Sequence, residues 1–147
     1  MKKITIKNLS DLENFAKDFL FNLKQVSADK TTIIALSGSL GAGKTTFVQL
    51  FAKELDVKEV VTSPTYTILK QYETGEDAKF KSLIHMDAYR LDSTEELNPL
   101  RFDEFLNQPN TLMCIEWAEK INEALPEDVI NISIVVTGED LREITVS

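Results

Sequence analysis

Apolar residues recur along this chain at two spacings, which predict an alternation of strands and helices. Residues 3–7 alternate polar and apolar side chains, and this predicts a short edge strand with one buried face. Residues 31–37 are β-branched and apolar, as in a buried strand, and residues 111–115 form the continuous apolar run of a strand covered on both faces. Residues 102–106 predict a short helix. A longer helix is predicted from an apolar stripe at helical spacing, made of Leu12, Phe15, Ala16, Phe19, Leu20 and Leu23.

Capping signals and a proline predict where two helices begin and end. Ser10 and Glu13 fit a capping box, so the first helix is expected to begin at Ser10. Ser93 and Glu96 fit a second capping box. It opens a short helix that Pro99 is expected to end or interrupt, because proline lacks the backbone donor that a helix interior needs.

Two pairs of strand-like runs predict β-hairpins. Residues 66–72 and 80–86 flank one polar turn, and residues 129–136 and 141–146 flank another. This order of elements predicts an α/β domain of three layers, in which helices cover both faces of a mixed sheet. We expect the sheet to be parallel near its centre and to carry antiparallel hairpins at its edges. The length of 147 residues predicts a single domain, residues 1–147.

A phosphate-binding motif stands between the second predicted strand and the helix that follows it. The residues from Gly38 to Thr45 fit G-x-x-x-x-G-K-[ST], and apolar residues recur at helical spacing after them. Free backbone N–H groups at the start of a helix, together with its dipole, attract phosphate oxygens, so we expect a P-loop NTPase-like site. Lys44 is expected to bridge the β- and γ-phosphates. The predicted cradle comprises Ser39, Leu40, Gly41, Ala42, Gly43, Lys44, Thr45 and Thr46.

Two carboxylates at the ends of predicted strands complete this site. Glu116 ends the most uniformly apolar strand, which is the Walker B pattern with glutamate in place of the commoner aspartate, and Asp87 ends a more polar one. We expect Thr45, Glu116 and Asp87 to bind Mg²⁺, and Lys44, Glu116 and Asp87 to be catalytic. His85 is the only histidine, and we interpret it as a packed, hydrogen-bonded residue.

Composition and missing motifs narrow the range of functions. The formal net charge of −8 argues against a broad nucleic-acid-binding face, so no DNA partner is expected and tRNA only through another protein. Cys114 is expected to be a buried thiol in a reducing compartment. No run approaches the ~18 apolar residues of a membrane span, and we expect a cytoplasmic protein. The chain has no Asn/Thr-Lys-x-Asp element for reading guanine, which favours ATP over GTP.

Four segments, taken together and in order, resemble one protein family. They are Gly-Ser-Leu-Gly-Ala-Gly-Lys-Thr-Thr-Phe at 38–47, Thr-Ser-Pro-Thr-Tyr at 62–66, His-Met-Asp-Ala-Tyr-Arg-Leu at 85–91 and Ile-Glu-Trp-Ala-Glu at 115–119. In these segments the chain is similar to the bacterial TsaE (YjeE) family, the ATPase of tRNA threonylcarbamoyladenosine biosynthesis. The resemblance implies ATP and Mg²⁺ binding, slow hydrolysis, and association with a TsaB–TsaD complex that transfers threonylcarbamoyl to adenosine 37 of ANN-decoding tRNAs.

The resemblance also implies roles for single residues. Trp117 would lie near the nucleotide, Thr65 would belong to a switch, and Asn14 would lie near the adenine. Two other functions stay open. One is a small-molecule or nucleoside kinase, which the presence of only three arginines (Arg90, Arg101 and Arg142) disfavours, because such kinases surround the transferring phosphoryl group with cations. The other is a nucleotide-dependent interaction module.

Overall fold

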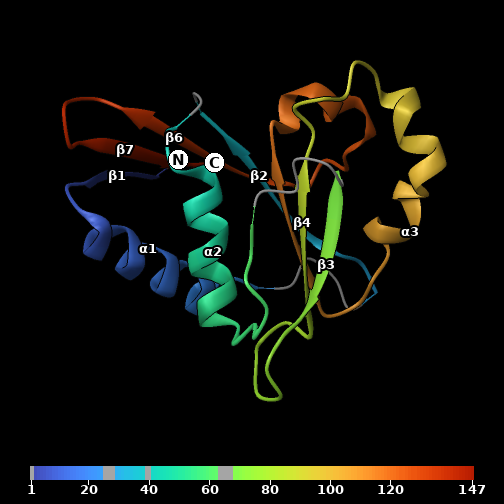
Figure 1. Cartoon of the computed structure of the whole chain (residues 1–147), viewed down its shortest axis with the longest axis horizontal. Helices are drawn as coiled ribbons and strands as arrows, with labels where there is room; N and C mark the ends of the chain where they lie inside the picture. Colours follow the sequence, from blue (N-terminus) through green and yellow to red (C-terminus); the bar gives the residue numbers. More distant parts are fainter. Residues whose placement is uncertain (1, 25–28, 39–40, 63–67) are drawn as a thin grey trace.

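A single mixed β-sheet forms the middle of the molecule in our computed structural model, which describes residues 2–24, 29–38, 41–62 and 68–147. In this described part, seven strands lie in the order β1-β7-β6-β2-β5-β4-β3 (Figure 1). The strands are β1 (Lys2–Ile6), β2 (Thr32–Ser37), β3 (Leu69–Glu73), β4 (Ser82–Asp87), β5 (Thr111–Glu116), β6 (Ile130–Val136) and β7 (Arg142–Val146). The helices are α1 (Leu9–Asn22), α2 (Lys44–Glu54) and α3 (Phe102–Leu106), with 3-10 helices η1 (Thr94–Leu100) and η2 (Ala118–Ala124).

The direction of the strands changes from the centre of the sheet to its edges. β2 pairs in parallel with both β5 and β6, and β4 pairs in parallel with β5. β3 pairs with β4, β6 with β7, and β1 with β7 in the antiparallel direction. The predicted mixed sheet, parallel at its centre with antiparallel hairpins towards its edges, is therefore confirmed, as is the edge position of β1.

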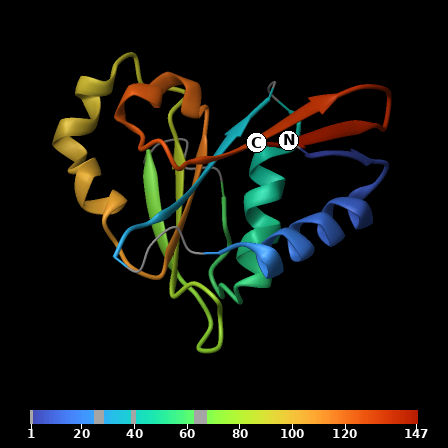
Figure 2. The same ribbon diagram turned by 180° about the vertical axis from the view of Figure 1, so that it is seen from behind.

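Helices cover the two faces of the sheet (Figures 1 and 2). Alternate residues of a strand point to opposite faces, so β2 sends Ile34 and Leu36 to one core and Ile33 and Ala35 to the other. The first core also contains the buried residues of α1 and α2, among them Phe15, Phe47 and Phe51. The second core contains residues of η1, α3 and η2. The prediction of three layers is thus confirmed.

The first helix begins earlier than predicted. Asn8 is its N-cap, with Oδ1 accepting from the Asp11 N–H at 2.8 Å, while the Asp11 carboxylate accepts from the Lys7 N–H at 3.0 Å. The predicted capping box of Ser10 and Glu13 is wrong, because the helix is already capped two residues upstream, by Asn8 on one side and by the bond from Lys7 to Asp11 on the other.

The second predicted capping box is only half present. Ser93 occupies the N-cap position of η1 but makes no side-chain cap bond, and Glu96 accepts from the N–H of Asp92 at 2.7 Å. The short helix is a 3-10 helix, in which Pro99 lies one residue before the end. Cys114 is buried in β5, as expected. Among the described helices, none is both long and apolar enough to cross a bilayer.

Candidate functional site

The phosphate-binding motif lies where β2 ends and α2 begins, and its glycines have backbone conformations that other residues rarely adopt. The φ angles are +144° at Gly38, +80° at Gly41 and +111° at Gly43, which is the N-cap of α2. A Cβ on Gly38 would meet the carbonyl oxygen of Ile134 in β6 at less than 3.0 Å. Arg142 of β7 donates from Nε to the Ala42 carbonyl at 2.9 Å. The cradle is therefore held by β6 and β7 as well as by its own glycines.

Lys44 is buried at the first position of α2, with 5% of its surface exposed. Its Nζ donates to the Gly38 carbonyl at 2.7 Å and lies 3.7 Å from the centre of the Trp117 ring, a cation–π contact. Burial lowers the pKa of the Lys44 amine, and the nearby carboxylates of Glu116, Glu119 and Asp87 partly oppose that shift. The cation thus sits in a poorly solvated position that would favour a bound anion.

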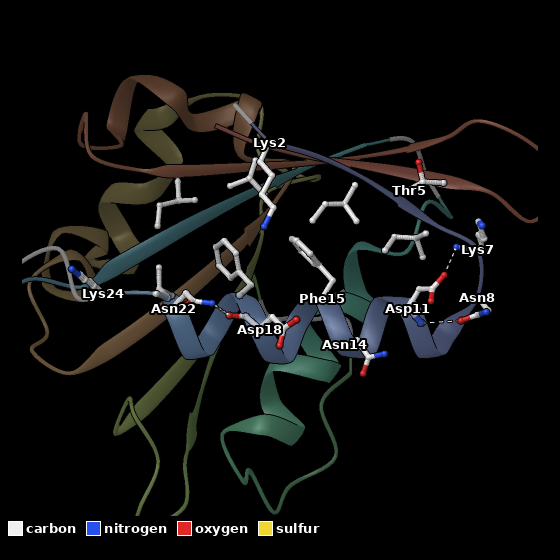
Figure 3. A pocket seen from close by; sticks show the side chains of 16 residues that line it. Lys2, Thr5, Lys7, Asn8, Asp11, Asn14, Phe15, Asp18, Asn22 and Lys24 are labelled. Atoms are coloured by element: carbon white, nitrogen blue, oxygen red, sulfur yellow. Dashed lines mark hydrogen bonds between the residues drawn. The ribbon is translucent and has the colours of Figure 1, made fainter.

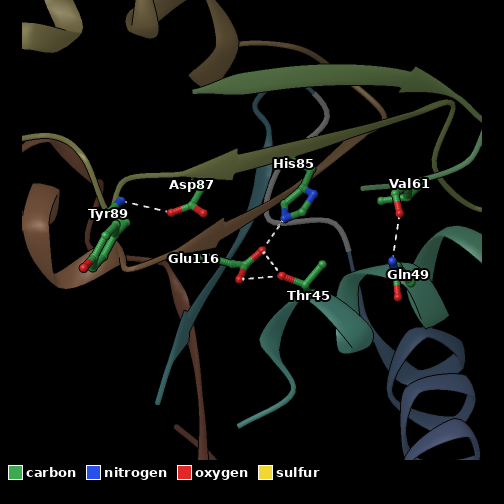
Figure 4. A network of polar contacts seen from close by, with 7 residues as sticks. All are labelled: Thr45, Gln49, Val61, His85, Asp87, Tyr89 and Glu116. Carbon is green, nitrogen blue, oxygen red and sulfur yellow. Dashed lines mark hydrogen bonds and ion pairs between the residues drawn. The ribbon is translucent and has the colours of Figure 1, made fainter. Parts of the chain in front are cut away.

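A connected polar network runs from α2 across β5 to β4 (Figure 4). The Thr45 hydroxyl lies 2.9 Å from Oε1 and 3.0 Å from Oε2 of Glu116, close enough for its one proton to reach either oxygen. His85 Nε2 lies 2.5 Å from Oε2 of the same carboxylate. Glu116 and His85 are 4% and 0% exposed. The His85–Glu116 part of the network is therefore shielded from solvent.

The parallel register of β4 and β5 explains why Asp87 and Glu116 lie at the same end of the sheet. Asp87 is opposite Glu116, and His85 is opposite Cys114, so the strand-end residues project on the face that α2 covers. Asp87 is half-buried, and its Oδ1 accepts from the Tyr89 N–H at 3.0 Å. Its carboxylate lies at the same end of the sheet as Glu116 (Figure 4).

One cavity of about 240 Å³ collects most of the predicted site residues: Gly41, Gly43, Lys44, Thr45, Thr46, Asp87, Glu116 and Trp117. A second cavity of about 510 Å³ adjoins it, because Gly41, Gly43 and Thr46 line both. Ala42 lines the second cavity with Lys7, Asn8, Leu9 and Arg142. The two cavities together run from the carboxylates over the P-loop to the start of α1.

Asn14 lies apart from the other predicted residues. It lines a cavity of about 900 Å³ between β1 and α1, together with Phe15, Asp18 and Lys2 (Figure 3). Ser39, Leu40 and Thr65 lie outside the described residues. The part of the chain that the structure describes contains no group of three or more His, Cys, Asp and Glu side chains able to hold a metal by themselves. A metal in this site would need the Thr45 hydroxyl and ligands brought by a nucleotide.

Several residues of the site were missed by the sequence analysis. His85 was interpreted as a packed, hydrogen-bonded residue, and this is confirmed, but its partner Glu116 was not predicted, because the contact depends on the pairing of two strands. Lys7, Asn8 and Leu9 reach the P-loop only because β1 is the far edge of the sheet and α1 turns back under it. No local pattern in the sequence gives these contacts; the His-x-Asp spacing, which puts both side chains on one face of a strand, was the one signal available.

Comparison with known proteins gives a consistent result. Residues 6–144 match the family described as threonylcarbamoyl adenosine biosynthesis protein TsaE. A tRNA threonylcarbamoyladenosine biosynthesis protein TsaE from Bacillus subtilis is 42% identical over 77% of this chain and 67% of that protein. One from Rickettsia prowazekii is 37% identical over 94% of this chain and 89% of that protein.

A solved structure agrees with the sequence relatives. The crystal structure of YdiB from Bacillus subtilis superimposes with a TM-score of 0.76 at 32% identity, and the match covers 99% of this chain and 83% of that one. The family match spans the P-loop, the His85–Asp87 segment and the Glu116–Trp117 segment, which are the elements that meet in the cavity. The chain belongs to the TsaE family.

Proposed function

We propose that this chain is a Mg²⁺-dependent ATPase that hydrolyses ATP slowly in support of tRNA N6-threonylcarbamoyladenosine formation by a TsaB–TsaD complex. The observation that carries the ATPase part is the pairing of Thr45 with Glu116 beside Lys44, at the N-terminus of α2. Family membership and the printed names of the relatives support the tRNA part.

The P-loop fits a chain of phosphates. Gly43 has no side chain with which to cap α2, so the first N–H groups of this helix, which belong to residues that line the cavity, have no side-chain partner from the cap. Gly41 has open space where a Cβ would stand, which lets a phosphate oxygen approach the backbone. Lys44 supplies a cation at the same place. A triphosphate would exchange the carbonyl and ring contacts of this amine for charge-assisted bonds.

The oxygen ligands at the inner end of the cavity fit Mg²⁺. Thr45 contributes a hydroxyl, Glu116 a buried carboxylate and Asp87 a half-buried carboxylate, and hard oxygen donors are those that Mg²⁺ prefers. Such an ion neutralises negative charge that develops on the β- and γ-phosphates. In our proposal Thr45 and Glu116 hold the ion, and Asp87 lies at the open side, where it can also orient the attacking water.

The adjoining cavity fits the nucleoside. It continues from Gly41 and Gly43 to Leu9, whose side chain is 57% exposed and offers an apolar surface to a flat base. Lys7 and Asn8 supply polar groups at the same wall. We therefore place the base at the start of α1, one helical turn or more before Asn14.

Trp117 has a conformation that fits a role at the phosphates. Its φ of +59° lies in the left-handed region, which costs a non-glycine residue about 1 kcal/mol. This conformation turns the chain directly after Glu116. The indole lies over the Lys44 amine, and the ring centre of Tyr89 is 5.1 Å from that of Trp117. A strained residue at a cavity wall is a common mark of function.

Reconstitution tests the whole proposal. TsaB, TsaD, substrate tRNA and an activated threonylcarbamoyl donor would be incubated with this chain and ATP, with this chain and a non-hydrolysable ATP analogue, or with the Lys44→Ala variant and ATP, and modified tRNA would be counted. We expect repeated modification only with the unaltered chain and hydrolysable ATP. Equal modification with the analogue would reject the role of hydrolysis and favour a nucleotide-dependent interaction module. A separate incubation of this chain with γ-labelled ATP and a nucleoside tests the kinase alternative. Transfer of the label to the nucleoside would indicate a kinase.

A further inference from the structure

His85 is completely buried in β4, yet its imidazole is not satisfied by the surrounding core. Nε2 contacts the Glu116 carboxylate at 2.5 Å, and Nδ1 has no hydrogen-bond partner among the residues that the structure describes. An unpaired polar atom in the interior costs a protein stability. Core packing alone therefore does not account for an imidazole here. Within the described parts of the chain, the polar contact of this ring is to Glu116.

The contact with His85 determines how much freedom Glu116 has. A glutamate side chain has three rotatable bonds, and the Thr45 hydroxyl can give its single proton to only one carboxylate oxygen at a time. An imidazole protonated at Nε2 would donate to Oε2, which would leave Oε1 for Thr45. The two donors come from β4 and α2, so together they fix the plane of the carboxylate from two sides (Figure 4).

We propose that His85 is a positioning residue for the metal site, holding the Glu116 carboxylate in the orientation that binds Mg²⁺ through an Nε2–H donor. This inference rests on the proposed function. Side chains that hydrogen-bond to metal-binding groups typically change metal affinity or activity by roughly 10- to 100-fold when they are replaced. We expect His85 to act with that magnitude, although it does not touch the nucleotide or the ion.

Two amide variants separate this role from simple filling of the core. In His85→Gln the amide nitrogen can occupy the position of Nε2, whereas in His85→Asn it reaches only the position of Nδ1 and stops short of Glu116. Both replace an imidazole by a neutral amide. The measured quantity is the ratio of the ADP dissociation constants in EDTA and in Mg²⁺, taken by titration calorimetry, since this ratio reports metal binding at the site.

We expect His85→Asn to reduce the Mg²⁺ enhancement of ADP affinity by roughly 10-fold or more, with ADP affinity in EDTA close to that of the unaltered chain. His85→Gln should keep most of the enhancement. An unchanged ratio in His85→Asn, or an equal loss in both variants, would overturn the positioning role. If the unaltered chain itself bound ADP without any effect of Mg²⁺, the proposed function would fail instead, so the two failures are distinguishable.

A measurement on the unaltered chain does not depend on whether a variant folds. His85 is the only histidine, so its two imidazole nitrogen signals in an ¹⁵N NMR spectrum need no assignment to a residue, and their different couplings to the ring C–H protons distinguish Nδ1 from Nε2. We expect the shift of a protonated nitrogen at Nε2, because the carboxylate oxygen accepts. An imidazole protonated at Nδ1 alone would present a lone pair to Glu116 and would refute the inference.

Discussion

Gly38 should be the least replaceable glycine of the phosphate cradle, and the Gly38→Ala variant tests why. Two costs add at this position. Its φ of +144° is unfavourable for any residue with a Cβ, at about 1–2 kcal/mol, and overpacking in a closed interior costs about 1–3 kcal/mol. The second cost arises because the new Cβ would lie less than 3.0 Å from the Ile134 carbonyl oxygen, which is backbone of β6 and cannot rotate away. We expect a loss of about 2–5 kcal/mol in the free energy of unfolding.

Gly41→Ala is the matched control. Gly41 has a φ of +80° but nothing within 4 Å of an added Cβ, so only the conformational cost of about 1–2 kcal/mol applies. Urea unfolding followed by circular dichroism would give both free energies, and the difference between the variants isolates the close approach to β6. The reasoning is refuted if Gly38→Ala is no less stable than Gly41→Ala, because the close contact would then contribute nothing.

The remaining predictions concern charge, catalysis and burial. Lys44→Ala should weaken ADP binding by roughly 10- to 100-fold in calorimetry, since a charge-assisted bond to phosphate contributes about 1.5–3 kcal/mol; unchanged affinity would remove Lys44 from the site. Burial lowers the pKa of Lys44 in the folded chain, so between that lowered pKa and 10.5 the unfolded chain binds more protons than the folded chain. This residue should therefore make the free energy of unfolding rise with pH in that window. In Lys44→Met this contribution to the slope of the free energy of unfolding against pH should be absent. Glu116→Ala should reduce ATP turnover by roughly 100-fold or more while most of the protein stays folded; a sharply lowered melting temperature with full activity in the folded fraction would make Glu116 structural. Cys114 is 0% exposed and burial raises the pKa of its thiol, so a thiol reagent should label the folded chain at least about 10³-fold more slowly than the urea-unfolded chain. tRNA alone should bind weakly in filter binding at physiological salt, given the net charge of −8, and tight binding would contradict that.

The strands and the glycine-rich turn before α2 could be predicted because their signals are local. A continuous apolar run at 111–115 needs no other part of the chain to be read as a strand covered on both faces, and β5 is buried along its whole length. The P-loop is similarly defined by glycine spacing, since the conformations at Gly41 and Gly43 are open mainly to glycine.

Helix starts were less predictable because several residues compete for one role. Asn8 and Ser10 are equally good N-caps by intrinsic preference, and each is followed three residues later by an acid, Asp11 or Glu13. The structure selects Asn8, whose side chain accepts from the Asp11 N–H, while the Asp11 carboxylate accepts from the N–H of Lys7. Capping preference could not separate Asn8 from Ser10, since their preferences differ by less free energy than the tertiary contacts around them contribute.

The contact between His85 and Glu116 lay beyond sequence reasoning for a different reason. It depends on β4 lying beside β5 in one register, with His85 opposite Cys114. A register shifted by two residues towards the start of β5 would have kept the same faces buried and placed His85 opposite Leu112, away from the carboxylate. The apolar and polar pattern of one strand predicts which face of the sheet a residue points to. Its register against the neighbouring strand depends on the whole sheet.

The two halves of the proposed site differ in how they are held, and this difference predicts where nucleotide binding would change the structure. Glu116 and His85 lie on β5 and β4, whose parallel pairing is buried on both faces, so the metal side is rigid before any ligand arrives. Lys44 is instead held by the Gly38 carbonyl and the Trp117 ring, and Trp117, the N-cap residue before η2, has a strained left-handed conformation. If a triphosphate binds the Lys44 amine, the cation–π contact with Trp117 is lost. The indole then no longer has the contact that holds it over the amine. The rearrangement on binding should therefore be found at Trp117 and the start of η2, with β4 and β5 unmoved.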